Sequence, residues 1–189
     1  MGLWDVLRGQ QRAKAPNLDN LFTVPGAAIT LQTAIDVLPT GVGSVCFRAA
    51  EGVAAGSAEA VATALVEQES GPAVERSVDS FGFTWLVVRR EPEDVSGLVT
   101  DLHAVNTELE MQGFASGLLC SIVGFGDTAG HRLGLVYLYK QGTFYPFAPN
   151  GAQSRDTLFE RQVRDLLTSD LRIEPDLGRW MPLWGAPGL

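Results

Sequence analysis

The chain has 189 residues, of which 46% are hydrophobic and 19% are charged, and its formal net charge is −8. These proportions exclude a disordered or fibrous chain, and the length suits one domain with its own core. The acidic balance repels a polyanion, so we expect no nucleic acid among the partners. No window holds the roughly 18 consecutive apolar residues of a membrane span, and no signal peptide is evident, which predicts a cytoplasmic protein.

Residues 1–16 predict a short amphipathic element at the N-terminus. An apolar helical face lies beside several basic residues, and such a face can contact a membrane surface or the groove of a partner. A helix that folds back onto the body of the protein explains the same pattern. Any membrane contact through residues 1–14 would be weak or indirect. The candidate partner contacts in this element are Leu3, Trp4, Leu7 and Arg8.

Residues 17–189 predict a single domain that includes a C-terminal arm over 173–189. At the start of this domain, a helical turn or two is expected before Pro25. The following string, AAITLQTAI, has no clear periodicity, and its secondary structure stays open at this point.

Five stretches predict the strands of a mostly antiparallel sheet, because they are rich in β-branched and aromatic residues and lie between turn signals. The loops GDTAGHR and KQG predict hairpins. Pro146 cannot donate a ladder hydrogen bond, so the last strand should lie at a sheet edge. Phe81, Phe83 and Trp85 are expected to pack in the core, whereas the aromatics of the edge hairpin could instead offer a recognition surface. The predicted strands are 41–49, 81–90, 118–125, 133–139 and 143–147.

Three main helices are predicted by apolar residues that recur every three or four positions. Each follows a residue that commonly caps helices: Ser57 for the first, Asp94 or Ser96 for the second, and Ser154 or Asp156 for the third. The predicted helices are 57–69, 94–112 and a third that ends near 171. The apolar face of the third helix comprises Leu158, Phe159, Val163, Leu166 and Leu167.

The interleaving of these helices with hairpin strands predicts an α+β fold, with a mostly antiparallel sheet of about five strands and three main helices. The C-terminal string EPDLGRWMPLWGAPGL is too rich in Pro and Gly for a regular helix, so we expect an extended arm. Its large apolar side chains need cover from the body or from a partner. Trp180 and Trp184 are therefore further candidate partner contacts.

Catalytic chemistry has little support in the sequence. Cys46 and Cys120 lie in apolar surroundings and are expected to be buried, reduced thiols without a disulfide. Together with His103 they could form a thiol nucleophile with its base, and His131 has Asp127 nearby. Residues scattered in this way are usually structural. We therefore assign no catalytic, cofactor-binding or metal-binding residues, and name Cys46, Cys120 and His103 as the candidate site if the protein is an enzyme.

Long strings across nearly the whole chain resemble the PspA-associated protein PspAB family of actinobacteria and archaea. The strings are NLDNLFTVPGAAITLQTA, FGFTWLVVRR, SGLVTDLHAVNTELE, LLCSIVGFGD, LVYLYKQGTFYPFAP and EPDLGRWMPLWGAPGL. The family name reports association with PspA, a helical membrane-remodelling scaffold of the phage-shock envelope-stress response that binds membranes peripherally.

The resemblance implies an adaptor or regulator that acts in the cytoplasm by contact with a PspA-like protein. Because the sequence shows no catalytic constellation, we expect a noncatalytic role and no cofactor. It carries no binding residues over to this chain and implies nothing about its oligomeric state. The alternative function is that of a small-molecule-binding or thiol-dependent enzymatic α+β domain.

Overall fold

The computed structural model describes residues 17–48 and 73–189. Six strands form one antiparallel sheet in the order β2-β3-β1-β4-β5-β6. The strands are β1 (Leu38–Phe47), β2 (Val74–Val78), β3 (Thr84–Arg89), β4 (Leu118–Gly126), β5 (Arg132–Leu138) and β6 (Thr143–Phe147). The helices are α1 (Val24–Ile35), α3 (Val95–Met111) and α4 (Thr157–Leu167), with short 3-10 turns η2 (Leu18–Thr23) and η3 (Leu177–Arg179).

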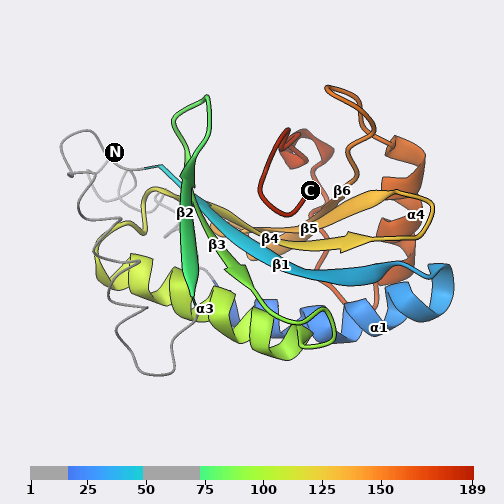
Figure 1. The fold of residues 1–189 in the computed structure, drawn as a ribbon, viewed down its shortest axis with the longest axis horizontal. Coiled ribbons are helices and arrows are strands. Elements are labelled where there is room, and N and C mark those ends of the chain that lie inside the picture. Colours follow the sequence, from blue (N-terminus) through green and yellow to red (C-terminus); the bar gives the residue numbers. More distant parts are fainter. Residues whose placement is uncertain (1–16, 49–72) are drawn as a thin grey trace, which may run out of the picture.

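The sheet separates two unequal layers. Figure 1 shows α1 and α3 on one face of the sheet and the C-terminal segment, residues 173–189, on the other. The main core lies between the helices and the sheet, and α4 packs against α1 and β6. A smaller apolar cluster on the opposite face lies between the sheet and the C-terminal segment. That outer face of the sheet carries the candidate site.

The predicted α+β class is confirmed, and the sheet has one strand more than expected. The additional strand is β2, whose residues are mostly exposed at a sheet edge, so it lacks the apolar alternation by which strands are recognised. The predicted hairpin of β4 and β5 and the edge position of the strand with Pro146 are confirmed. The predicted helix 57–69 and the N-terminal element 1–16 lie outside the described residues.

The segment whose secondary structure the sequence left open is α1. Its buried residues recur at helical spacing, as Val24, Ala27, Ala28 and Leu31. Small alanines and an exposed Ile29 dilute this pattern in the sequence. Pro25 lies in the first turn of α1, where a helix tolerates proline, and so it does not end the helix that begins at Val24.

The two other helices follow their sequence signals closely. The side chain of Asp94 accepts a hydrogen bond from Gly97 N at 2.8 Å and caps α3, and Asp156 caps α4 by accepting from Phe159 N. Gly113 has a φ of +86° just beyond the C-terminal end of α3. Two details were wrong. Leu158, expected on the apolar face of α4, is 79% exposed, and α4 ends at Leu167 and not near residue 171.

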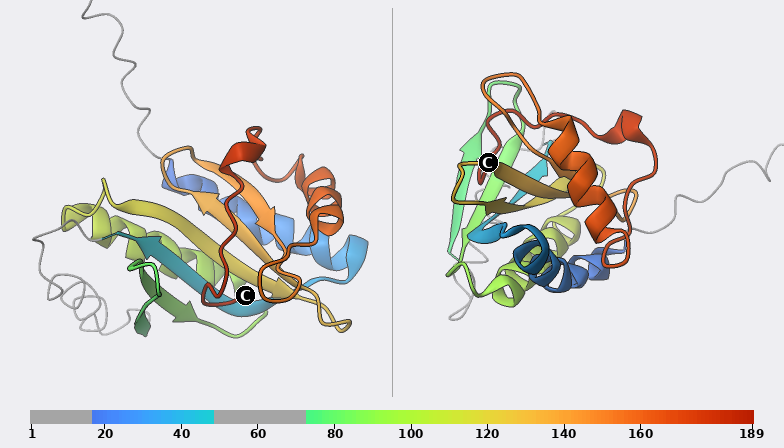
Figure 2. Two further views of the ribbon diagram at one scale, coloured as in Figure 1. Left: turned by 90° about the horizontal axis from the view of Figure 1, so that it is seen from above. Right: turned by 90° about the vertical axis from the view of Figure 1, so that its right-hand side faces the viewer.

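The C-terminal segment is fastened to the outer face of the sheet, across which it runs in Figure 2. The ring of Trp180 stacks on Tyr145 of β6 at 5.8 Å between centroids, and its Nε1 donates to Glu174 O. Tyr145 donates from its hydroxyl to Met181 O at 2.9 Å, and Ser44 of β1 donates to Pro187 O at 3.1 Å. These contacts attach the C-terminal segment to β1 and to β6.

Candidate functional site

An apolar groove of about 530 Å³ lies on the outer face of the sheet. One side comes from the tip of the β2–β3 hairpin, and another comes from the C-terminal segment; both project on the same side of the sheet in Figure 1. The lining is predominantly aliphatic and aromatic, with Asp79 and Lys140 as its charged members. Such a concave apolar surface is typical of a binding site.

The floor of the groove is one row of side chains that crosses four strands. Cys46 of β1 lies directly opposite Trp85 of β3 on one side and Cys120 of β4 on the other. Cys120 in turn lies opposite Leu138 of β5. All four residues line the groove. Because cross-strand partners project from the same face, the register alone gathers residues that are far apart in the sequence.

Two large apolar side chains of the groove are exposed to solvent. Phe81, at the hairpin tip, is 71% exposed, and Met181, in the C-terminal segment, is 58% exposed. Single exposed hydrophobic residues are common, but two of them beside one apolar groove indicate an interaction surface. The expectation that Phe81 packs in the core is therefore wrong: β3 begins at Thr84, and Phe81 belongs to the turn before it.

The hairpin tip that carries Phe81 is held by one carboxylate. Asp79 Oδ1 accepts from the backbone N–H groups of Phe81 at 2.9 Å and Phe83 at 3.0 Å, and Oδ2 accepts from Trp85 Nε1 at 2.9 Å. Desolvation raises the pKa of Asp79, but these hydrogen bonds outweigh it and leave the pKa below its usual value. The ionised carboxylate thus fixes the hairpin tip beside the groove.

The candidate catalytic residues of the sequence are only partly brought together. Cys46 and Cys120 are adjacent and are 3% and 5% exposed, respectively. The hydrogen bond with Cys120, and burial after it, raise the pKa of the Cys46 thiol. His103 belongs to α3 on the other face of the sheet, where its Nε2 lies 3.4 Å from Asp19 Oδ1 and its ring packs near Phe22. These residues form no thiol–histidine couple.

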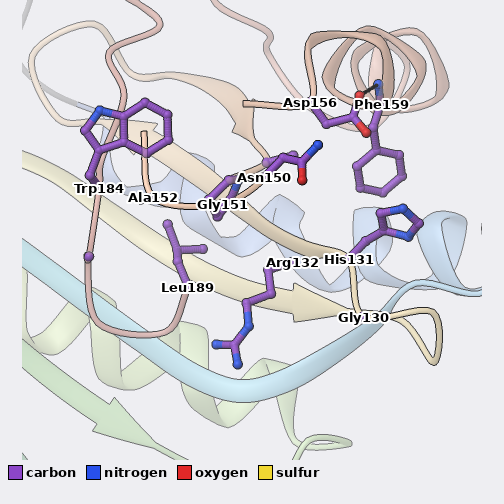
Figure 3. Close-up of a pocket in the computed structure, with 13 residues that line it drawn as sticks. Gly130, His131, Arg132, Asn150, Gly151, Ala152, Asp156, Phe159, Trp184 and Leu189 are labelled. Atoms are coloured by element: carbon purple, nitrogen blue, oxygen red, sulfur yellow. Dashed lines mark hydrogen bonds between the residues drawn. The ribbon is translucent and has the colours of Figure 1, made fainter. Parts of the chain in front are cut away.

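A second pocket, of about 520 Å³, lies between the β4–β5 turn, the connection from β6 to α4 and the end of the chain. Figure 3 shows the His131 ring pointing towards Phe159, while the Arg132 side chain extends away from it. His131 Nδ1 lies 2.6 Å from Asp127 Oδ2, and Asp156 is occupied as the cap of α4.

Burial raises the pKa of Asp127, but its hydrogen bonds with His131 outweigh this and lower the pKa overall. At the second pocket, His131 thus pairs with Asp127, and Asp156 pairs with the backbone of α4. Over residues 17–48 and 73–189, no group of three or more His, Cys, Asp or Glu side chains is arranged to hold a metal ion.

The predicted partner contacts occupy different environments. Trp180 is 7% exposed, so its ring holds the C-terminal segment in place. Trp184 is partly exposed, lines both pockets and packs edge-on against Phe147 at 5.2 Å between centroids. Leu3, Trp4, Leu7 and Arg8 lie outside the described residues. All six stay predictions, and Phe81 and Met181 join them from the structure.

The fold and the site define an α+β domain with helices on one face of its sheet and an apolar groove on the other. The family model described as PspA associated protein B matches residues 1–188, so the chain belongs to that family. Neither the curated proteins nor the solved structures contain a match to this chain. Among the described residues, no helix has the length and apolar character needed to cross a membrane.

Proposed function

We propose that this protein is a noncatalytic adaptor that binds a PspA-like scaffold protein through the apolar groove. In this proposal it acts in the cytoplasm as part of the envelope-stress response, and it reaches the inner face of the membrane through its partner. Membership of the PspA-associated family supports the choice of partner. The observation that carries the choice of surface is the groove with Phe81 and Met181 exposed beside it.

The apolar lining of the groove suits a protein segment with an apolar face. An amphipathic helix binds such a surface with apolar side chains spaced three or four residues apart, and a helical scaffold can supply such helices. The partly exposed Trp184 at the same groove would add an aromatic contact of the kind enriched at interface hot spots. The partner would thus cover the exposed apolar side chains.

The surroundings of the groove are ordered before a partner arrives. Asp79 fixes the hairpin tip, and Trp180 fixes the C-terminal segment that carries Met181. A backbone that is already ordered loses little conformational freedom on binding, which leaves more of the burial free energy as affinity. Full burial of a Phe or Met side chain contributes about 1.5–3 kcal/mol, so loss of either contact should weaken binding roughly tenfold or more.

The experiment is a binding measurement between the purified protein and a PspA-like protein, with paired variants. Phe81→Ala and Met181→Ala remove the exposed side chains of the groove. The matched controls are Phe22→Ala and Met111→Ala, which are 49% and 76% exposed and lie on η2 and α3, on the helical face. The groove variants should weaken binding at least tenfold and the controls should leave it unchanged; the opposite pattern would place the contact on the helical face.

A second candidate function is the binding of an apolar small molecule in the same groove. Its volume of about 530 Å³ falls within the range of ligand pockets, roughly 300–1,000 Å³, and its lining is mostly apolar. An environment-sensitive apolar dye separates the two candidates. Displacement of the dye by a cell lipid extract, combined with no binding of the PspA-like protein, would favour this second function.

A further inference from the structure

The floor of the groove contains the only two cysteines of the chain, directly opposite each other on adjacent strands. Cys46 and Cys120 are both free thiols, and both belong to the apolar cluster on the outer face of the sheet. Their side chains therefore project from the same face. This pairing depends on β1 and β4 being neighbours in the sheet, because the two residues are distant in sequence.

The backbone geometry of this pair suits a disulfide. Residues directly opposite each other on antiparallel strands have Cα atoms about 4.5–5.5 Å apart, and a disulfide spans about 4.4–6.8 Å between Cα atoms. The neighbouring Cys120 thiol raises the pKa of Cys46, as expected for two sulfurs that lie close together. A bond between the sulfurs can thus form with little movement of the strands.

Access to the pair is selective. Both cysteines are almost completely buried, so a macromolecular thiol or a second copy of the chain cannot approach them in the folded protein. Both nevertheless line the groove, and a small molecule that enters the groove meets them. Because most of the lining is apolar, an apolar reagent should enter more readily than a polar one of similar size.

We propose that Cys46 and Cys120 form a redox-active dithiol that closes to an intramolecular disulfide when an apolar organic hydroperoxide enters the groove. This inference does not depend on the groove binding a protein partner. It assigns the floor of the groove as a modification site whose substrate class is an alkyl or aryl hydroperoxide.

The chemistry balances with the hydroperoxide as the oxidant. A thiolate attacks the outer peroxide oxygen, the O–O bond breaks, and the alcohol leaves with the proton that the thiol lost, giving a sulfenic acid. The second thiol then attacks this sulfur, the S–S bond forms, and the hydroxyl group leaves with the second thiol proton as water. Two thiols are oxidised, and one hydroperoxide is reduced to an alcohol and water.

Either sulfur can attack the hydroperoxide, because the two cysteines are equivalent in their access to the groove, and the other then resolves the sulfenic acid. The reacting species is the thiolate, and the raised pKa of Cys46 makes its thiolate scarce at neutral pH. Slow oxidation, over minutes or longer, is expected for so buried a pair.

The experiment treats the reduced, folded full-length protein with cumene hydroperoxide or with hydrogen peroxide at equal concentration, and follows the intact mass. Formation of the disulfide lowers the mass by about two hydrogen atoms, with no covalent dimer. We expect cumene hydroperoxide to react several times faster than hydrogen peroxide in the folded protein, and this preference to disappear in urea. Oxidation that occurs only in urea, oxidation to dimers, or equal rates for both oxidants in the folded protein would overturn the proposal.

Two variants test the sulfenic acid intermediate. In Cys46→Ser and in Cys120→Ser, a sulfenic acid on the remaining cysteine lacks its resolving partner and should be trapped by dimedone after treatment with cumene hydroperoxide. Absence of a dimedone adduct from both folded variants would contradict the sulfenic acid route to the disulfide. The measurement on the unaltered protein stands even if a variant fails to fold.

Discussion

Replacement of Trp180 by alanine tests whether the C-terminal segment is an integral part of the fold. The Trp180 side chain is 7% exposed, stacks on Tyr145 and donates from Nε1 to Glu174 O at 3.0 Å. A buried aromatic side chain removes about 150–250 Å² from water, which at about 25 cal/mol per Å² gives roughly 4–6 kcal/mol as an upper bound. Measured costs of Phe or Trp to Ala in cores are about 3–5 kcal/mol.

We therefore expect Trp180→Ala to lower the free energy of unfolding by about 3–5 kcal/mol, measured by urea denaturation. The slope of this free energy against urea concentration should stay unchanged. Trp180→Phe keeps an aromatic ring against Tyr145 but loses the hydrogen bond to Glu174 O, so it should cost only about 1 kcal/mol. Hydrogen exchange should show faster exchange in residues 181–189 of the alanine variant. A loss below about 1 kcal/mol for Trp180→Ala would refute the reasoning, since the segment would then unfold separately from the sheet.

Three further predictions follow from single contacts. The pKa of Asp79 is lowered in the folded state, so the ionised carboxylate stabilises the fold fully above the ordinary Asp pKa of about 3.9 and less as the pH falls through the lowered value. Asp79→Asn should therefore reduce the urea midpoint of unfolding more at pH 7 than at pH 2.5. Equal reductions at the two pH values would contradict this. Gly43→Ala would place a Cβ 2.9 Å from a side-chain carbon of the fully buried Leu102, so it should lower the free energy of unfolding, measured in urea, by about 1–3 kcal/mol. A neutral effect would show that the Leu102 side chain gives way without cost. Burial raises the pKa of all three tyrosines, that of Tyr137 to about 12, so the folded state favours the neutral phenols. The free energy of unfolding should therefore begin to fall as the pH rises above about 10, the ordinary Tyr pKa. Ultraviolet titration should show no tyrosinate in the folded protein at pH 10, and a normal tyrosine titration there would contradict the burial.

Elements with strong local signals could be predicted from the sequence. The apolar stripe of α3, its Asp94 cap and Gly113 at its end are all local signals, and they place the helix closely. The β4–β5 hairpin is similar, since its turn residues and its apolar strands are neighbours in the sequence. In these cases local preference and tertiary packing agree.

Elements without such signals needed the structure. β2 has the sequence VERSV and is mostly exposed, so hydrogen bonds to β3 define it as a strand. The helical spacing in α1 is present but is carried partly by alanines, whose weak hydrophobicity hides the period. Phe81 looked like the first residue of a strand, and the signal against this was the turn residue Asp79 two positions earlier.

The groove could not have been found from the sequence, because its floor and sides come together only through strand order and register. Cys46 and Cys120 each look like an ordinary buried thiol, and only the pairing of β1 with β4 makes them neighbours. Met181 lies in a segment whose destination the sequence did not reveal. Local patterns set the individual elements, whereas the site arises from long-range pairing.

The proposed function is tested most directly by the affinity between the purified protein and a PspA-like protein, compared for two double variants. Phe81→Ala with Met181→Ala should raise the dissociation constant at least roughly tenfold, because it removes two side chains that the partner would bury. Phe22→Ala with Met111→Ala removes the same two residue types from the helical face and should leave the dissociation constant unchanged. Equal affinity for the unaltered protein and the groove double variant would contradict the assignment of the groove as the partner's binding surface.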